Sequence, residues 1–255
     1  MEQKHHLFVI SAAGGNATAI RILEHALPRA EYEEKGKQLM TETEKSGAEQ
    51  CGFLIPSENH FEMAGGEFCG NASRAAALLL SRIHNVGTIS FTVSGFSGKV
   101  SGEVIQTPDK NKADVRCVFP GMRVSSKELK NVHGHTGTLV DLGGIVHFVI
   151  NAPFPKNYEE IHRAITKELG LEKRDAVGVV WIQKEGESVM MHPVVWVRAI
   201  DTFFYETSCG SGTIAVGKVT GERFIVQPSG GTIESIFFGD QMVVLRSIME
   251  VIHES

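Results

Sequence analysis

The sequence predicts an α+β protein made of two similar domains, each a curved, mostly antiparallel sheet wrapped around a central helix. Three observations predict this fold class. Segments of the first half recur in the second half, a small apolar helix follows one repeat in each half, and strand-turn-strand patterns surround those helices. A helix that is apolar around its whole circumference is buried on every side, and in a strand-rich chain a curved sheet is its expected cover.

Two pairs of segments recur at one offset. The segment Phe8–Ala12 (FVISA) recurs as Phe148–Ala152 (FVINA), and Cys69–Ser73 (CGNAS) recurs as Cys209–Thr213 (CGSGT). Both offsets are 140 residues, the difference between positions 8 and 148 and between 69 and 209. Self-similarity in one order indicates a duplicated chain.

The duplication predicts the domain organisation. We expect an N-terminal α/β domain over residues 1–125 that carries Cys69, and a C-terminal α/β domain over 126–255 that carries Cys209. The last strand could return to the first domain. The polar stretch from Ser125 to Gly137 is the expected boundary, because domain boundaries fall in polar segments.

In each half a helix precedes a strand, and the cysteine segment follows. By correspondence with the second half we expect a helix over 30–44, and strand-forming residues predict a strand over 52–55. In the second half Asn157 and Glu160 are the expected capping-box pair of a helix, and a strand over 177–182 follows it.

Each of the two repeated cysteines is followed by a short apolar run. Residues 75–80 read AAALLL and residues 214–217 read IAVG. Such runs predict two small, enclosed helices.

Composition and charge exclude several functional classes. The chain has 255 residues, of which 42% are hydrophobic and 22% charged, so we expect a folded globular protein. Its net charge of -5, without a long run of one sign, gives no reason to expect nucleic acid or a membrane surface as a partner. No apolar stretch approaches the roughly 18 residues of a membrane helix. We expect a cytoplasmic protein that acts on a small molecule.

The cysteines and histidines do not predict a metal or disulfide site. Cys51, Cys69, Cys117 and Cys209 are widely spaced without a CxxC motif, and the eleven histidines lack the spacing of a metal site. We therefore expect free thiols and no bound metal. Cys51 and Cys117 are expected to be inert core thiols.

Cys69 and Cys209 are the candidate catalytic residues. A glycine follows each cysteine and allows close approach of a ligand, while the helix that follows presents unpaired N–H groups and the positive end of its dipole. That environment favours an anion and is expected to lower a thiol pKa toward neutrality. An isolated cysteine is usually a small core residue, but two in equivalent positions favour a function.

Two equivalent thiols at one cleft suit the inversion of a carbon centre without a cofactor. One sulfur removes the proton from one face of the carbon, and the other returns a proton to the opposite face. An α-carboxylate held at the helix starts would lie where negative charge grows in the transition state.

The two cysteine segments resemble the paired motifs of the pyridoxal-phosphate-independent amino-acid racemases, the diaminopimelate epimerase superfamily. The motifs are Gly66–Ala72 and Glu206–Thr213, and the resemblance extends to Gly14–Asn16, Gly47–Gln50, Val146–Val149 and Gln227–Gly231. It thus covers most of the chain. It implies a diaminopimelate epimerase-like fold, no cofactor and a homodimer.

The resemblance also implies roles for individual residues. Cys69 and Cys209 match the acid–base pair of the superfamily. The groups implied to bind the substrate carboxylate are Gly70, Asn71, Gly210 and Ser211; Asn16 and Gln50 match positions that line the cleft, and His147 matches a histidine that supports catalysis.

Departures from the superfamily pattern bear on the substrate. Met63, Ile145 and Gly178 stand where diaminopimelate epimerase has asparagines, so the distal centre of diaminopimelate would lack partners here. Unpaired polar groups of a substrate can cost on the order of 10⁴ in discrimination. Diaminopimelate is therefore disfavoured.

The motifs are more similar to the histidine racemases of opine-type metallophore biosynthesis. The similarity is carried by Met63–Cys69, by Glu49 with Gln50, and by Glu206–Cys209. It implies interconversion of L- and D-histidine. Glu49 and Glu206 are candidates to accept a hydrogen bond from the imidazole or the ammonium group, and Asp201 is a weaker candidate.

Other functions remain open at this point. Within the same reaction class, the substrate could be proline, hydroxyproline or diaminopimelate. Outside it, the chain could be a thiol–disulfide or metal-binding protein that uses the two cysteines, or an amino-acid-binding module without catalysis.

Overall fold

The computed structural model of this chain describes residues 6–186, 188–198, 201–239 and 241–255. Contacts divide the chain into two compact units, Met1–Pro120 together with Val244–Ser255, and Gly121–Val243. Both units are sheet-dominated with few helices, an α+β architecture. The division falls after Pro120, whereas the sequence places it after residue 125.

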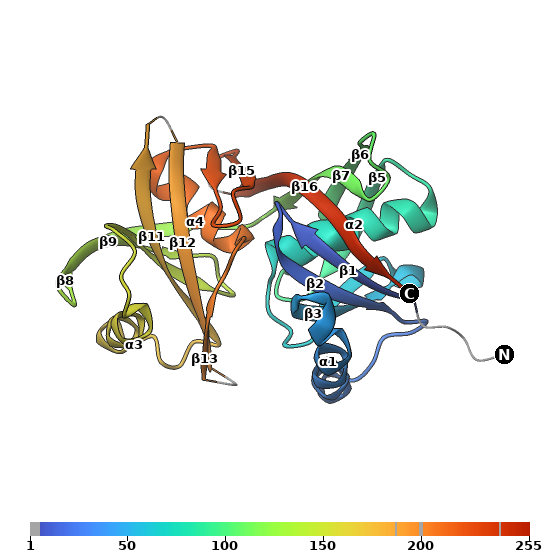
Figure 1. Ribbon diagram of the computed structural model, residues 1–255, viewed down its shortest axis with the longest axis horizontal. Helices are drawn as coiled ribbons and strands as arrows, with labels where there is room; N and C mark the ends of the chain where they lie inside the picture. Colours follow the sequence, from blue (N-terminus) through green and yellow to red (C-terminus); the bar gives the residue numbers. More distant parts are fainter. Residues whose placement is uncertain (1–5, 187, 199–200, 240) are drawn as a thin grey trace. The chain divides into compact units, whose positions relative to one another are not determined.

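The first unit is a closed barrel of eight strands. In chain order its elements are β1 (Leu7–Ala12), β2 (Gly15–Ile22), α1 (Arg29–Thr43), η1 (Glu44–Ser46), β3 (Ala48–Ile55), η2 (Pro56–Glu58), β4 (His60–Met63), α2 (Gly70–His84), β5 (Thr88–Val93), β6 (Val100–Gln106), β7 (Lys112–Pro120) and β16 (Met242–Glu254). The strands pair in the order β1-β2-β3-β4-β5-β6-β7-β16, and β16 pairs with β1 to complete the ring. Figure 1 shows β16, in red, beside β1, in blue.

Most pairs of the barrel are antiparallel, and β2–β3 and β4–β5 are parallel. Helix α2 contacts β1, β2, β4, β5, β6 and β7, and every residue from Gly70 to Ser81 is buried. The apolar run over 75–80 therefore predicted an enclosed helix correctly. Its C-cap is Asn85, a residue type that tolerates the left-handed conformation found there.

Helix α1 covers another part of the same barrel. Tyr32 and Leu39 of α1 pack in one buried cluster with alternate residues of three strands: Leu7, Val9, Ala17, Ala19, Cys51, Phe53 and Ile55. Alternation along a strand points the residues between them to the opposite face. The predicted helix over 30–44 and the strand over 52–55 are confirmed as α1 and the second half of β3.

The second unit is an open mixed sheet. Its elements are β8 (Ser125–Val132), β9 (His135–Asp141), β10 (Val146–Asn151), α3 (Tyr158–Glu168), β11 (Ala176–Glu185), β12 (Ser188–Val197), β13 (Thr202–Tyr205), α4 (Gly210–Thr220), β14 (Phe224–Val226) and β15 (Thr232–Phe237). The pairing order is β15-β14-β12-β11-β10-β9-β8, and β13 pairs with β12. Helix α3 covers a cluster that contains Phe148, Trp181 and Val194.

Helix α4 of this unit contacts β9, β10, β11, β14 and β15 and is buried from Gly210 to Gly217. Helix α3 begins after Asn157 as predicted. The Asn157 side chain accepts no hydrogen bond from the backbone of the helix; its side-chain Nδ2 instead donates to the Glu160 carboxylate. The predicted strand over 177–182 lies within β11.

The polar stretch that the sequence marks as a boundary is a β-hairpin of the second unit. Strands β8 and β9 pair antiparallel, and the turn between them contains His133 and Gly134, both with positive φ. The stretch is polar because most residues of β8 are exposed, not because it links domains.

Candidate active site

Cys69 and Cys209 occupy the same position on two helices. Each is the N-cap residue, with φ -133° and ψ 114° at Cys69 and φ -135° and ψ 109° at Cys209. The Ala72 amide donates to Cys69 Sγ at 3.4 Å, and the Gly212 amide donates to Cys209 Sγ at 3.2 Å. Each sulfur therefore lies at the positive end of a helix dipole. We call each cysteine with its helix start a half-site.

The carbonyl groups of the two cysteines are held in the same way. Ser73 donates to Cys69 O through its amide at 3.0 Å and its hydroxyl at 2.7 Å. Thr213 donates to Cys209 O through its amide at 3.0 Å and its hydroxyl at 2.7 Å. The two half-sites thus share backbone conformation and local bonding, although their side chains differ.

In the first half-site the Cys69 thiol is partly exposed and donates to Gln50 Oε1 at 3.3 Å. Gln50 lies on β3, and its Nε2 donates to Thr18 Oγ1 on β2 at 2.8 Å. Asn71, on the first turn of α2, is buried and accepts a hydrogen bond from Arg74. Gln50 and Asn71 therefore both lie at the Cys69 end of α2.

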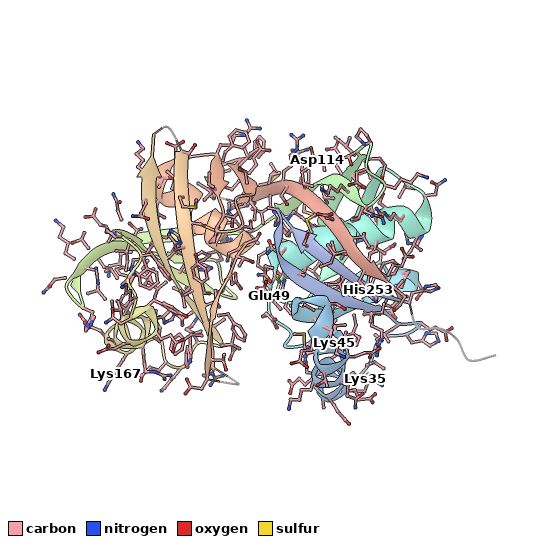
Figure 2. All side chains as sticks on the ribbon, in the orientation of Figure 1. Lys35, Lys45, Glu49, Asp114, Lys167 and His253 are labelled. Carbon is pink, nitrogen blue, oxygen red and sulfur yellow. The ribbon has the colours of Figure 1, made fainter. Side chains whose placement is uncertain are left out.

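Asn16 and Glu49 begin the two strands that carry Thr18 and Gln50. Asn16 is buried with φ 39°, a left-handed conformation that asparagine tolerates. Glu49 is exposed at the start of β3 and is labelled in Figure 2. Both predicted residues therefore lie near the N-terminal ends of β2 and β3; Asn16 is buried and Glu49 is exposed.

In the second half-site Cys209 is buried, with 1% of its surface exposed. Burial raises the pKa of its thiol well above the ordinary value, and the charge and hydrogen bond of Glu206 raise the pKa further. Ser211, whose hydroxyl lies 3.5 Å from the sulfur, and the Gly212 amide act in the opposite direction. The predicted pKa near neutrality is wrong for Cys209, because burial outweighs the helix dipole, and this cysteine is a thiol at neutral pH.

Gln227 anchors the second half-site, and sequence analysis gave it no role. Its side chain is fully buried; Oε1 accepts from the Cys209 amide at 2.9 Å, while Nε2 donates to Thr213 Oγ1 at 3.1 Å and Ile225 O at 3.0 Å. The sequence did carry a signal for this role, since Gln227 is a polar residue that directly follows the apolar strand β14 and precedes Gly230 and Gly231.

His147 is buried on β10, and neither ring nitrogen has a hydrogen-bond partner among the described residues. Burial lowers its pKa to about 3, and nearby His162 contributes to the decrease, so the ring is neutral at pH 7. A Cβ added at Gly178, its register partner on β11, would lie 2.0 Å from Nδ1. The absence of a side chain at position 178 therefore makes room for the imidazole.

Comparison with known proteins identifies the family. The family model described as "Histidine racemase CntK N-terminal domain" matches residues 8–233. The chain is 34% identical over 220 residues to a histidine racemase of Fusobacterium nucleatum subsp. nucleatum, covering 82% of this chain and 80% of that protein. It is 25% identical over 250 residues to a histidine racemase of Staphylococcus aureus, covering 86% and 84%. The chain belongs to the histidine racemase family. It is an isomerase of the amino-acid racemase type.

Solved structures support the same fold at low sequence identity. A PhzC/PhzF phenazine-biosynthesis protein from Clostridium difficile superposes with a TM-score of 0.61 at 15% identity, covering 98% of each chain. A protein described as a predicted epimerase from Pseudomonas aeruginosa superposes with a TM-score of 0.67 at 14% identity, covering 99% of this chain and 98% of that one. This member of the histidine racemase family therefore has the PhzF/epimerase-like fold.

The remaining cysteines of this racemase-family protein are core thiols. Burial raises the pKa of Cys51 and of Cys117 to about 12, so neither is ionised at neutral pH. None of the four cysteines, all of which lie in the described ranges, forms a disulfide bond. Within the described ranges, no group of three or more His, Cys, Asp or Glu side chains could hold a metal ion.

Asp201, the weaker candidate for a hydrogen bond to histidine, has two hydrogen-bond partners within its own unit. Its Oδ1 accepts from Trp196 Nε1 at 2.7 Å and from Arg163 Nη1 at 3.1 Å. The Trp196 hydrogen bond, and then the Arg163 hydrogen bond and charge, lower the pKa of this carboxyl group. Asp201 therefore closes the turn before β13.

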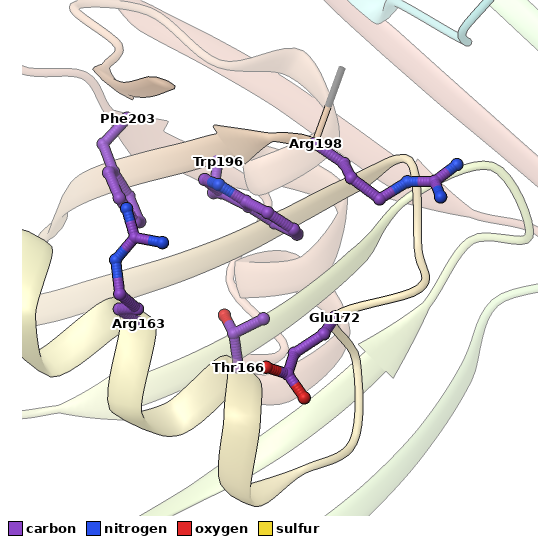
Figure 3. Close-up of a pocket in the computed structure, with 6 residues that line it drawn as sticks. All are labelled: Arg163, Thr166, Glu172, Trp196, Arg198 and Phe203. Carbon is purple, nitrogen blue, oxygen red and sulfur yellow. The ribbon is translucent and has the colours of Figure 1, made fainter. Parts of the chain in front are cut away.

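A pocket of about 180 Å³ lies beside this turn, and Figure 3 shows its lining. Its lining residues are Arg163, Thr166, Glu172, Trp196, Arg198 and Phe203. The pocket contains none of the predicted site residues.

Across the described part of the chain, no helix is long and apolar enough to cross a membrane.

Proposed function

We propose that the protein interconverts L- and D-histidine without pyridoxal phosphate or another cofactor, with Cys69 and Cys209 as its two bases. The observation that carries the proposal is the matched geometry of the two half-sites, in which each sulfur caps its helix and accepts a helix N–H. Family membership and the names of the relatives support histidine as the substrate.

The proposed reaction conserves protons over one turnover. One sulfur, as thiolate, takes the α-proton and becomes a thiol, and the other sulfur gives its proton to the opposite face and becomes a thiolate. The next turnover runs in the reverse direction from that state. Burial and the neighbouring Glu206 raise the pKa of the Cys209 thiol, which favours the proton-donating form of this sulfur.

The substrate carboxylate is proposed to bind at the two helix starts. Gly70 and Asn71 begin α2, and Gly210 and Ser211 begin α4, so each pair lies where backbone N–H groups lack intrahelical partners. As the α-carbon loses its proton, negative charge spreads toward the carboxylate, and donors already in place stabilise that charge. The same helix starts thus bind the substrate and lower the barrier.

The other predicted residues are proposed to bind the rest of histidine. Glu206 hydrogen-bonds the Cys209 thiol and, with the exposed Glu49, is a candidate acceptor for the ammonium or imidazole group. Asn16 and Gln50 line the site beside Cys69. His147 stays neutral and supports catalysis on the Cys209 side, within the same unit.

The proposal extends to the architecture. We infer that the two units are duplicated domains built around α2 and α4, each with its cysteine at the N-cap, and that the protein is a homodimer. The repeats at a common offset and the equal N-cap geometries support the duplication. Light scattering of the purified protein tests the dimer, and a mass of 27.8 kDa would contradict it.

The reaction is tested by incubating L-histidine with the protein in D₂O without added pyridoxal phosphate. We expect deuterium at the α-carbon by mass spectrometry and D-histidine by chiral chromatography. Cys69→Ser and Cys209→Ser should each slow racemisation by at least about 10²-fold, because each removes one acid–base group. Ser73→Ala, which leaves both thiols, is the matched control and should retain far more activity.

A panel of proline, hydroxyproline and diaminopimelate under the same conditions tests the substrate. Exchange with proline and none with histidine would overturn the substrate assignment. A reversible Cys69–Cys209 disulfide, with no α-proton exchange for any amino acid, would overturn the racemase mechanism itself.

A further inference from the structure

We propose that Thr18 is a positioning residue that holds the Gln50 amide with its carbonyl oxygen against the Cys69 thiol. The inference rests on the proposed function only in that Cys69 is one of the two bases there. No motif of the sequence analysis included Thr18.

The geometry joins three side chains in one line of hydrogen bonds. Gln50 Nε2 donates to Thr18 Oγ1 at 2.8 Å, and Gln50 Oε1 accepts from Cys69 Sγ at 3.3 Å. A side-chain amide has a donor end and an acceptor end. In this arrangement the Thr18 hydroxyl accepts from the amide nitrogen, and the amide oxygen faces the sulfur.

The strand register explains why position 18 serves this purpose. The Cα atoms of Thr18 and Gln50 are partners in the parallel β2–β3 pair, so the two side chains lie on one face of the sheet. Their neighbours Ala17 and Cys51 belong to the cluster under α1, on the opposite face. Thr18 is only 1% exposed, so its hydroxyl is shielded from solvent.

The orientation of the amide decides which form of Cys69 is stabilised. A carbonyl oxygen can accept a proton from the thiol but repels a thiolate, so the observed orientation favours the protonated sulfur. The reversed amide would direct Nε2–H toward the sulfur and favour the thiolate. Thr18 thus stabilises the thiol form of Cys69, the form that this sulfur holds after it has taken an α-proton and before it returns one in the reverse direction.

The ionisable residues that adjoin Cys69 and Gln50 in the sequence stay the same when only position 18 changes. Glu67 and Arg74 lie within five positions of Cys69, and Glu49 and Cys51 flank Gln50. Burial raises the pKa of Glu67 and of Cys51, and a substitution at position 18 neither adds nor removes an ionisable group. A shift between variants therefore reports the amide.

The test measures alkylation of Cys69 by iodoacetamide as a function of pH, with the modified peptide quantified by mass spectrometry. Thr18→Val keeps the branched shape but frees the amide to turn, and we expect the alkylation midpoint to fall by about 0.5 to 1 pH unit. Thr18→Ser keeps the hydroxyl and should match the wild type. The Cys209 peptide is the internal control and should keep its profile in all variants.

A double-mutant cycle separates positioning from packing. Gln50→Leu removes the amide, so Thr18→Val should have no further effect on the midpoint in that background. An unchanged or raised midpoint in Thr18→Val, or an equal shift in both backgrounds, would overturn the proposal. If valine destabilises β2, the same comparison is made with Thr18→Ala against Thr18→Ser.

The alkylation assay does not use histidine, so it is independent of the racemase assignment. A shifted midpoint with no deuterium incorporation would keep the role of Thr18 and overturn the proposed reaction. Racemisation by the wild type with no shift in Thr18→Val would overturn only the role of Thr18.

Discussion

The side chains of the two half-sites differ more than their backbones do. Cys69 is partly exposed and bonded to a neutral amide, whereas Cys209 is buried beside the Glu206 carboxylate. A carboxylate beside a buried sulfur opposes a second negative charge, so Cys209 keeps its proton more firmly. Equal positions on two helices therefore do not give equal surroundings.

Gly178 is expected to be intolerant of any side chain. The methyl group of Gly178→Ala would lie 2.0 Å from His147 Nδ1, so the ring or the strand must move, at a cost of about 1 to 3 kcal/mol. Gly87→Ala is the matched control, because only Val104 O, at 4.0 Å, lies near its added Cβ. Urea unfolding of both variants measures the difference, and equal midpoints would contradict the steric argument.

Buried neutral histidines are expected to make stability depend on pH. Burial lowers the pKa of His147 to about 3 and that of His162 to about 4, below the ordinary value of 6.5. Between pH 6.5 and the lowered pKa values, the unfolded chain therefore binds more protons than the folded chain. The free energy of unfolding accordingly falls as the pH falls from 6.5. Between pH 7 and 5 each histidine should cost about 2 kcal/mol.

Denaturant titrations at pH 7, 6 and 5 measure this loss. In His147→Gln the dependence on pH should be shallower than in the wild type, because one group that takes up a proton on unfolding is gone. A wild-type free energy of unfolding that is constant across this range would contradict the burial of both rings as neutral groups.

At the scale of elements, polar side chains that follow strands bond the segments that lead into α2 and α4. Ser94, which follows β5, accepts from the Met63 amide and donates to Glu67 O, fixing the loop before α2. Gln227, which follows β14, accepts from the Cys209 amide. Strand ends thus set where the two helices begin.

Replacement of Gln227 should damage the start of α4. Gln227→Met keeps the approximate volume but leaves the buried Cys209 amide without its acceptor, which costs about 1 to 3 kcal/mol of stability. Gln38→Met, at an exposed position of α1, is the control and should change stability by less than about 0.5 kcal/mol. Thermal melts of both proteins test this, and equal melting temperatures would refute the anchoring role.

The sequence predicts these elements better than it predicts their contacts. Helix α3 and strands β3 and β11 follow from hydrophobic spacing and strand-forming residues, which are local properties, and α1 follows from the correspondence between the two halves. The bond from Gln50 to Thr18 spans 32 positions and depends on strand register, and the raised pKa of Cys209 depends on burial. Neither property is encoded in a local sequence pattern, so both could be found only from the three-dimensional structure.

At the scale of the whole molecule, the first unit is discontinuous in sequence. Its barrel uses Met1–Pro120 and then Val244–Ser255, with the whole second unit between them. Strand β16 contributes the buried residues Val244, Leu245 and Met249, and its Arg246 pairs with Asp114 of β7, which is labelled in Figure 2. The closing strand is therefore part of the core.

Removal of Val244–Ser255 should prevent the first unit from folding. The deletion removes buried apolar side chains and leaves β1 and β7 without their shared neighbour, so we expect lost cooperative unfolding and rapid proteolysis of residues 6–120. Deletion of 253–255 alone removes exposed residues and the Leu7–Ser255 backbone pair, and should lower the melting temperature only slightly. A cooperative melt of the longer deletion would contradict this role of β16.

The late position of β16 imposes an order on biosynthesis. A ribosome makes the segment that completes the barrel last, after the entire second unit has been translated. Until β16 has been made and has left the ribosome, the nascent N-terminal half carries two sheet edges open to pairing with other chains. The Cys69 half-site is thus the first to be translated, while the barrel around its helix is the last structure to close.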